Sequence, residues 1–195
     1  GQGSLAVRTQ LRPRSAEEKS EINSKGHDNA DGNGSSGRSN AQNAAVELAA
    51  ARLRQAMQDK PDLAELSKHI LIDDTPEGVR IQLVDQDGRS MFEAGRAEPK
   101  PHTQRLLHEV ANVVAALPNR ISIAGHTDGG AFQGPGGYSN WDLSAARANA
   151  SLKVLLDSGV GQDQVAEVAG KAGSAPLYPD NPMASANRRI SVVLL

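Results

Sequence analysis

The sequence has no cysteine and only a handful of aromatic residues among its 195 positions. Absence of cysteine fits an exported protein, although many cytosolic chains lack it too. With aromatic residues at 3%, the core has to be built from Val, Ile, Leu and Ala. The formal net charge is −2 and no basic stripe is visible, which argues against a nucleic-acid-binding groove.

Long apolar runs are also absent. No stretch reaches the roughly 18 apolar residues that a membrane-spanning helix needs, so we do not expect this sequence to span a membrane. It carries no signal peptide, and it opens with Gly1-Gln2-Gly3-Ser4 instead of Met. We interpret that opening as an expression remnant and expect any targeting or membrane segment to lie upstream.

The length suits one domain of ordinary size with an appendage. Residues 1–42 include a polar stretch rich in Gly, Ser and Asn, which buries too little apolar surface to offset the entropy of ordering it. We therefore predict a tag remnant and flexible linker over 1–42, an N-terminal helical segment over 43–69, and a domain over 70–195.

Hydrophobic periodicity predicts the elements of that domain and of the segment before it. Helical spacing occurs at 44–59, 102–117 and 143–158, with a short helix at 62–68. Strands are expected at 70–72, 79–84, 120–124, 165–169 and 189–194. This order predicts an α/β (α+β) two-layer sandwich, a mixed sheet with helices on one face. The helix at 44–59 either packs on the domain's own sheet or forms part of a dimer or partner surface.

One acid and one arginine stand out. Asp128 follows a predicted strand, and Arg147 lies early in the helix after a glycine-rich loop. A carboxylate and a guanidinium in one pocket can clamp a ligand that carries both an ammonium and a carboxylate. The alternative is a plain structural ion pair. Ser139 or Ser144 can cap the helix, and the sequence does not choose between them.

Neighbouring residues offer other interpretations. His126 and Asp128 form an H-x-D pair, but a catalytic zinc site needs a third ligand, so we expect His126 to pack or hydrogen-bond near the pocket rim. The glycines of 129–137 lack the Gly-Lys-Ser/Thr ending of a phosphate loop and favour a mobile rim. Three aromatic residues fall close together and indicate either a sugar- or partner-contacting surface or a small core under the loop: Phe132, Tyr138 and Trp141.

Three ordered motifs resemble the signature of OmpA-like peptidoglycan-binding domains, and the resemblance covers about 70–195. They are Gly125-His126-Thr127-Asp128, Leu143-Ser144-Ala145-Ala146-Arg147-Ala148 and Asn187-Arg188-Arg189. The resemblance implies that Asp128 and Arg147 grip diaminopimelate of the peptide stem, and that Thr127, Asn140 and Arg188 line or brace the pocket. It implies no enzyme activity, cofactor or metal.

Other segments resemble the MotB family of flagellar stator subunits, among them Met91-Phe92, Pro118–Ile123 and Gly137–Trp141. Ser139 between Tyr138 and Asn140, and the long glycine-rich loop, depart from the general pattern in a MotB-like way. The resemblance implies a periplasmic domain of an inner-membrane protein, a homodimer, and a MotA-type partner bound through a membrane segment outside this sequence. An outer-membrane–wall tether of the OmpA or lipoprotein type and an enzyme acting on wall peptides remain alternatives, the latter without a recognisable nucleophile–base pair.

Overall fold

The structure is a computed structural model that describes residues 34–195, with side chains for residues 40, 41 and 43–195. Most of the segment expected to be tag and linker lies outside the described residues. Its last part, from Gly34, begins helix α1 (Gly34–Asp59), which is therefore longer than the helix predicted over 44–59. None of the described helices is long and apolar enough to cross a membrane.

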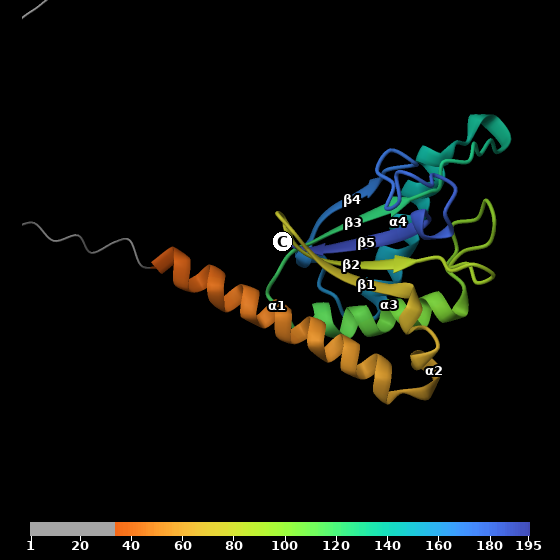
Figure 1. The fold of residues 1–195 in the computed structure, drawn as a ribbon. Coiled ribbons are helices and arrows are strands. Elements are labelled where there is room, and N and C mark those ends of the chain that lie inside the picture. Colours follow the sequence, from red (N-terminus) through yellow and green to blue (C-terminus); the bar gives the residue numbers. More distant parts are fainter. Residues whose placement is uncertain (1–33) are drawn as a thin grey trace, which may run out of the picture. The chain divides into compact units, whose positions relative to one another are not determined.

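A five-stranded mixed sheet forms the centre of the domain, with strand order β1-β2-β5-β3-β4 (Figure 1). All neighbours are antiparallel except β3 and β4, which are parallel. The sequence prediction of a mixed sheet is confirmed. The strands are β1 (Ile70–Thr75), β2 (Gly78–Val84), β3 (Ile121–His126), β4 (Val165–Gly170) and β5 (Arg189–Leu194).

Helices α3 (Pro101–Val114) and α4 (Asn140–Asp157) pack against this sheet and supply the second layer. Alternate strand residues face them, because side chains alternate along a strand. The fully buried core joins these strand residues to the apolar stripe of α3: Ile81, Leu83, Ile121, Ile123, Ile190, Val192, Leu106, Leu107 and Val110. The two-layer architecture expected from the sequence is thus confirmed.

Helix α1 contributes to the same core from Val46 onward. Val46, Leu53 and Met57 are buried there, and short helix α2 (Pro61–Ala64) adds Leu63. The lysine between α1 and α2 is tied to α3, since Lys60 Nζ lies 2.6 Å from Glu109 Oε1. Residues 44–59 therefore pack on the domain itself.

Several element boundaries differ from the predictions: α3 ends at Val114 and not at 117, and β3 continues to His126. The short helix expected at 62–68 is split into α2 and a 3-10 turn at Ser67–His69. Strand β1 extends past Ile72 through Asp73 to Thr75, because the Asp73 carboxylate pairs with the Arg80 guanidinium directly across the β1–β2 ladder. Asp73, which lies just outside the strand predicted over 70–72, is thus a cross-strand partner.

The strand residues that face away from α3 and α4 include several buried polar side chains. Arg189 Nε donates to Gln82 Oε1 at 2.8 Å, and Arg189 Nη2 donates to the carbonyl of Ala175 at 2.8 Å. His126 Nε2 lies 3.3 Å from Ser191 Oγ. Most buried polar groups in proteins are hydrogen-bonded, and the bond from Arg189 to Ala175 holds the segment after β4 against the sheet.

Candidate functional site

A pocket of about 340 Å³ lies where β3 ends and α4 begins. It gathers residues from four parts of the chain: the segment after β2, the end of β3, the start of α4 and the residue before β5. The five residues expected from the sequence to line or brace a site all lie at this pocket: Thr127, Asp128, Asn140, Arg147 and Arg188. Asp85, Ser90, Phe92, Ala94, Gly95, Gly130, Ala131, Phe132 and Leu143 complete the lining.

Asp128 is partnered by Arg188. Its Oδ2 accepts from Arg188 Nη1 at 2.6 Å, and its Oδ1 accepts from the backbone N–H of Gly130 at 2.9 Å. In the part of the chain that the structure describes, Asp128 and Arg147 form no ion pair. The sequence alternative of a structural salt bridge between those two residues is therefore not what the structure shows.

Arg147 is held by backbone carbonyls instead. Its Nε donates to the carbonyl of Arg96 at 2.8 Å and its Nη2 to that of Glu93 at 3.1 Å, while the guanidinium lies 4.9 Å from the centre of the Phe92 ring. Burial lowers the pKa of Arg147, but a guanidinium stays charged in a protein. Among the described residues, its Nη1 has no hydrogen-bond partner. The Nη1 group of Arg147 can therefore donate hydrogen bonds to a ligand.

The start of α4 is fixed by Ser139, which settles the choice between the two candidate caps. The Asp142 carboxylate accepts from the Ser139 backbone N–H at 2.8 Å and from its hydroxyl at 3.0 Å, and these bonds lower the pKa of Asp142. Ser144 instead accepts from the N–H of Ala172 at 3.0 Å. Asn140, next to the cap, donates to the carbonyl of Gly130 at 2.7 Å and holds the pocket's rim.

Asp85 is the main site residue that the sequence analysis missed. It is 4% exposed, and its Oδ2 accepts from Arg188 Nε at 2.8 Å while its Oδ1 accepts from the N–H of Met91 at 2.7 Å. Arg188 is therefore bound between two carboxylates, Asp85 and Asp128, and these partners raise its pKa against the opposing effect of burial. The available signal was an acid placed immediately after the alternating strand Val79–Val84.

The aromatic residues near the loop divide into two kinds. The rings of Phe132 and Tyr138 meet edge to face with centroids 6.1 Å apart, as expected for a small cluster under the loop. The Trp141 side chain is 57% exposed. Phe132 and Tyr138 therefore pack together, while Trp141 is exposed, and a sugar- or partner-contacting surface there stays a prediction.

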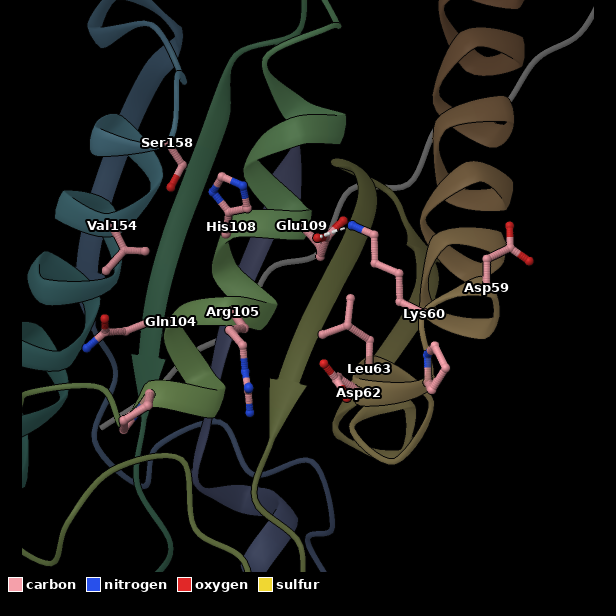
Figure 2. A pocket seen from close by; sticks show the side chains of 12 residues that line it. Asp59, Lys60, Asp62, Leu63, Gln104, Arg105, His108, Glu109, Val154 and Ser158 are labelled. Atoms are coloured by element: carbon pink, nitrogen blue, oxygen red, sulfur yellow. Dashed lines mark hydrogen bonds and ion pairs between the residues drawn. The ribbon is translucent and has the colours of Figure 1, made fainter.

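A larger cavity of about 850 Å³ lies beside α2, α3 and the C-terminal end of α4, and Figure 2 shows it. None of the expected site residues lines it. Its most buried charged group, Glu109, is already paired with Lys60, and the charged residues around it do not converge on one point. The smaller pocket is the better candidate for a binding site, because the Asp128 carboxylate and the unpaired Nη1 of Arg147 both line it.

His126 is buried directly before the lining residue Thr127 and hydrogen-bonds to Ser191, but it does not itself line the pocket. It faces the polar side of the sheet instead, where burial, with Arg189 and Lys171 nearby, lowers its pKa to about 3. Among the residues that the structure describes, no group of three His, Asp or Glu side chains gathers as a metal site requires.

The depressed pKa of His126 predicts an acid-dependent loss of stability. In the unfolded chain the imidazole of His126 becomes protonated near pH 6.5, whereas in the folded chain its pKa is about 3. Below pH 6.5 the free energy of unfolding should therefore fall by up to about 1.4 kcal/mol per pH unit from this group alone. Urea titrations at pH 6.5 and 5.0 should show His126→Gln losing about 2 kcal/mol less than wild type. Exposed His108→Gln is the matched control, and equal losses in all three proteins would contradict the assignment.

The sequence of this chain was compared with known protein families and proteins. The OmpA family matches residues 91–189. Motility protein B of Escherichia coli K12 is 42% identical over 144 residues, which are 73% of this chain and 47% of that protein. The chain thus spans about half the length of the curated relatives it matches.

Solved structures share the fold at low sequence identity. A putative MotB-like protein from Desulfovibrio vulgaris superposes with a TM-score of 0.63 at 20% identity, covering 80% of this chain and 96% of that one. The cell wall anchor of the T6SS from Pseudomonas aeruginosa gives 0.57 at 19% identity, covering 69% and 94%. The family match covers the pocket-lining residues from Phe92 to Arg188, and the chain belongs to the OmpA family.

Proposed function

We propose that this domain binds peptidoglycan without catalysing a reaction, and that it anchors a flagellar motor stator of the MotA/MotB type to the cell wall. The observation that carries the proposal is the pocket in which the Asp128 carboxylate and the open side of the Arg147 guanidinium lie together. The 42% identity to motility protein B favours a stator over an outer-membrane or lipoprotein-type tether.

The ligand we assign to the pocket is the diaminopimelate residue of the wall's peptide stem. That residue carries an ammonium and a carboxylate on one carbon. Asp128 accepts from the ammonium, and Arg147 Nη1 donates to the carboxylate. Arg188 braces Asp128, Asn140 holds the Gly130 carbonyl, and the Thr127 hydroxyl donates to the carbonyl of Asp128. These three residues position the two that grip the ligand.

The lining of the pocket supports a binding role. Among the described residues that line it there is neither histidine nor cysteine. Both charged groups are pinned by hydrogen bonds, as suits a preformed receptor.

Magnitudes argue for several sites acting together. Two charge-assisted contacts contribute roughly 1.5–3 kcal/mol each, and a millimolar dissociation constant already corresponds to about 4 kcal/mol. One pocket therefore binds one stem weakly, and firm anchoring needs at least two pockets on one lattice, where avidity adds a factor of about 10²–10⁴. We accordingly propose a homodimer in the periplasm, joined to a MotA-type partner through the membrane portion of the full protein.

Co-sedimentation with purified cell wall tests the proposal. The chain should pellet with peptidoglycan whose stem contains diaminopimelate, and free diaminopimelate at millimolar concentration should release it. Peptidoglycan with lysine at that stem position is the matched control, because lysine lacks the second carboxylate. Equal sedimentation with both kinds of peptidoglycan would contradict the assignment of diaminopimelate as the ligand. Sedimentation with neither would contradict the proposed function.

A further inference from the structure

A second, smaller hollow of about 280 Å³ adjoins the pocket just described and shares two residues with it, Ser90 and Arg188. Its remaining lining includes Arg89, Lys100 and His102. We call these three residues, together with Arg188, the cationic pocket. Among the described residues no carboxylate lines it, so the charged side chains that line it are all basic.

The cations of this pocket differ in how far they are neutralised. Arg188 is bound to Asp85 and Asp128. Lys100 Nζ lies 2.9 Å from Ser90 Oγ and 3.2 Å from Glu93 Oε1, but the Glu93 side chain is 65% exposed, so that ion pair is weak. The Arg89 side chain makes no hydrogen bond or ion pair with any residue that the structure describes. At least one positive charge is therefore left over.

The backbone adds to the same field. Helix α3 starts beside this hollow, with Lys100 as its cap and Pro101 as its first residue. No acidic residue lies in its first turn and no side chain caps it, so the first N–H groups and the positive end of the helix dipole are not offset. Burial and the nearby Arg89 lower the pKa of His102, in keeping with a positive surrounding.

Resting on the proposed function, we infer that the cationic pocket binds a second carboxylate of the same wall peptide whose diamino acid occupies the neighbouring pocket. The shared wall of Ser90 and Arg188 keeps the two groups close, so the second carboxylate belongs to an adjacent stem residue. The α-carboxylate of D-glutamate, which is linked through its side chain to diaminopimelate, has this placement. Arg89 and Lys100 then bind the anion, and Arg188 serves both pockets.

Two synthetic tripeptides test this directly: L-Ala-γ-D-Glu-diaminopimelate with the glutamate α-carboxylate free, and the same peptide with that group amidated. Titration of the full chain by calorimetry should give about tenfold tighter binding of the free acid, because one charge-assisted contact is lost in the amide. Arg89→Gln should lower the affinity for the acid toward that for the amide and leave the affinity for the amide unchanged. Arg105→Gln, an exposed arginine on α3 with the same change in charge, should alter neither.

The outcomes separate this inference from the function on which it rests. Equal binding of the two peptides by wild type, or equal weakening of both by Arg89→Gln, overturns the cationic pocket while leaving the diamino-acid site in place. If Asp128→Asn binds neither peptide, and wild type binds the free acid more tightly than the amide, both assignments are supported. Failure of wild type to bind either peptide overturns the proposed function, and the inference with it.

Discussion

Asp128→Asn is expected to remove binding to diaminopimelate-containing peptidoglycan while the domain stays folded. The substitution keeps the shape of the side chain and cancels the charge that would accept from the ligand's ammonium. One charge-assisted contact of about 1.5–3 kcal/mol corresponds to a loss of roughly 10–100-fold, enough to bring a weak site below detection. Co-sedimentation measures the loss, and urea denaturation measures the fold.

The fold should survive because Arg188 keeps a second carboxylate. Asp85 is buried and holds Arg188 Nε at 2.8 Å, so the guanidinium is not left unpaired. Asp62→Asn, on exposed α2, is the matched control for loss of one negative charge. If Asp128→Asn pellets as wild type does, the wall is held elsewhere. If Asp128→Asn unfolds, the carboxylate has a structural role instead.

Gly125→Ala should cost about 3 kcal/mol or more of the free energy of unfolding. A Cβ on Gly125 would lie 2.1 Å from the carbonyl oxygen of Ser144 and 2.9 Å from its carbonyl carbon. Both are backbone atoms of α4, so no side-chain rotation relieves the contact. The helix has to move away from β3, and in doing so it moves Arg147 away from Asp128.

Stability and wall binding should therefore fall together in Gly125→Ala. Gly136→Ala is the control: its φ is +68°, yet nothing lies within 4 Å of the added carbon, so only the backbone preference of about 1 kcal/mol is lost. Urea denaturation of both variants gives the comparison. A loss of less than 1 kcal/mol in Gly125→Ala would mean that the sheet and α4 are not in contact at this point.

Periodicity predicted the strands and the long helices because each buries one face. The pattern of Leu106, Leu107 and Val110 needs no knowledge of the rest of the chain, and the alternation of Val79, Ile81 and Leu83 is equally local. The ends of strands were predicted less accurately where a charged residue pairs with a residue on the neighbouring strand, as Asp73 of β1 does with Arg80 of β2. Such pairs depend on strand register, which periodicity does not report.

Site residues were found through motifs, but their contacts were not. Asp128 and Arg147 were expected to share a pocket and clamp a ligand, with a direct ion pair as the alternative. In the structure Asp128 is bound by Arg188 from the far end of the sequence, and Arg147 by the carbonyls of Glu93 and Arg96. Carbonyl partners leave no trace in residue types. Asp85 was missed for a related reason, because its significance comes from Arg188, and β2 and β5 become neighbours only in the folded sheet.

The bond between Arg188 and Asp128 also favours a short lifetime for each attachment in the proposed complex. In the proposed complex, the ligand's ammonium meets a carboxylate that already has a cation at 2.6 Å, and the two cations share that carboxylate. With a dissociation constant near 0.1–1 mM and association at roughly 10⁶–10⁷ M⁻¹s⁻¹, each contact persists for roughly 0.1–10 ms. A load held through several such contacts stays in place while each one is repeatedly broken and remade. The domain can then leave the wall without any bond in the wall being cut.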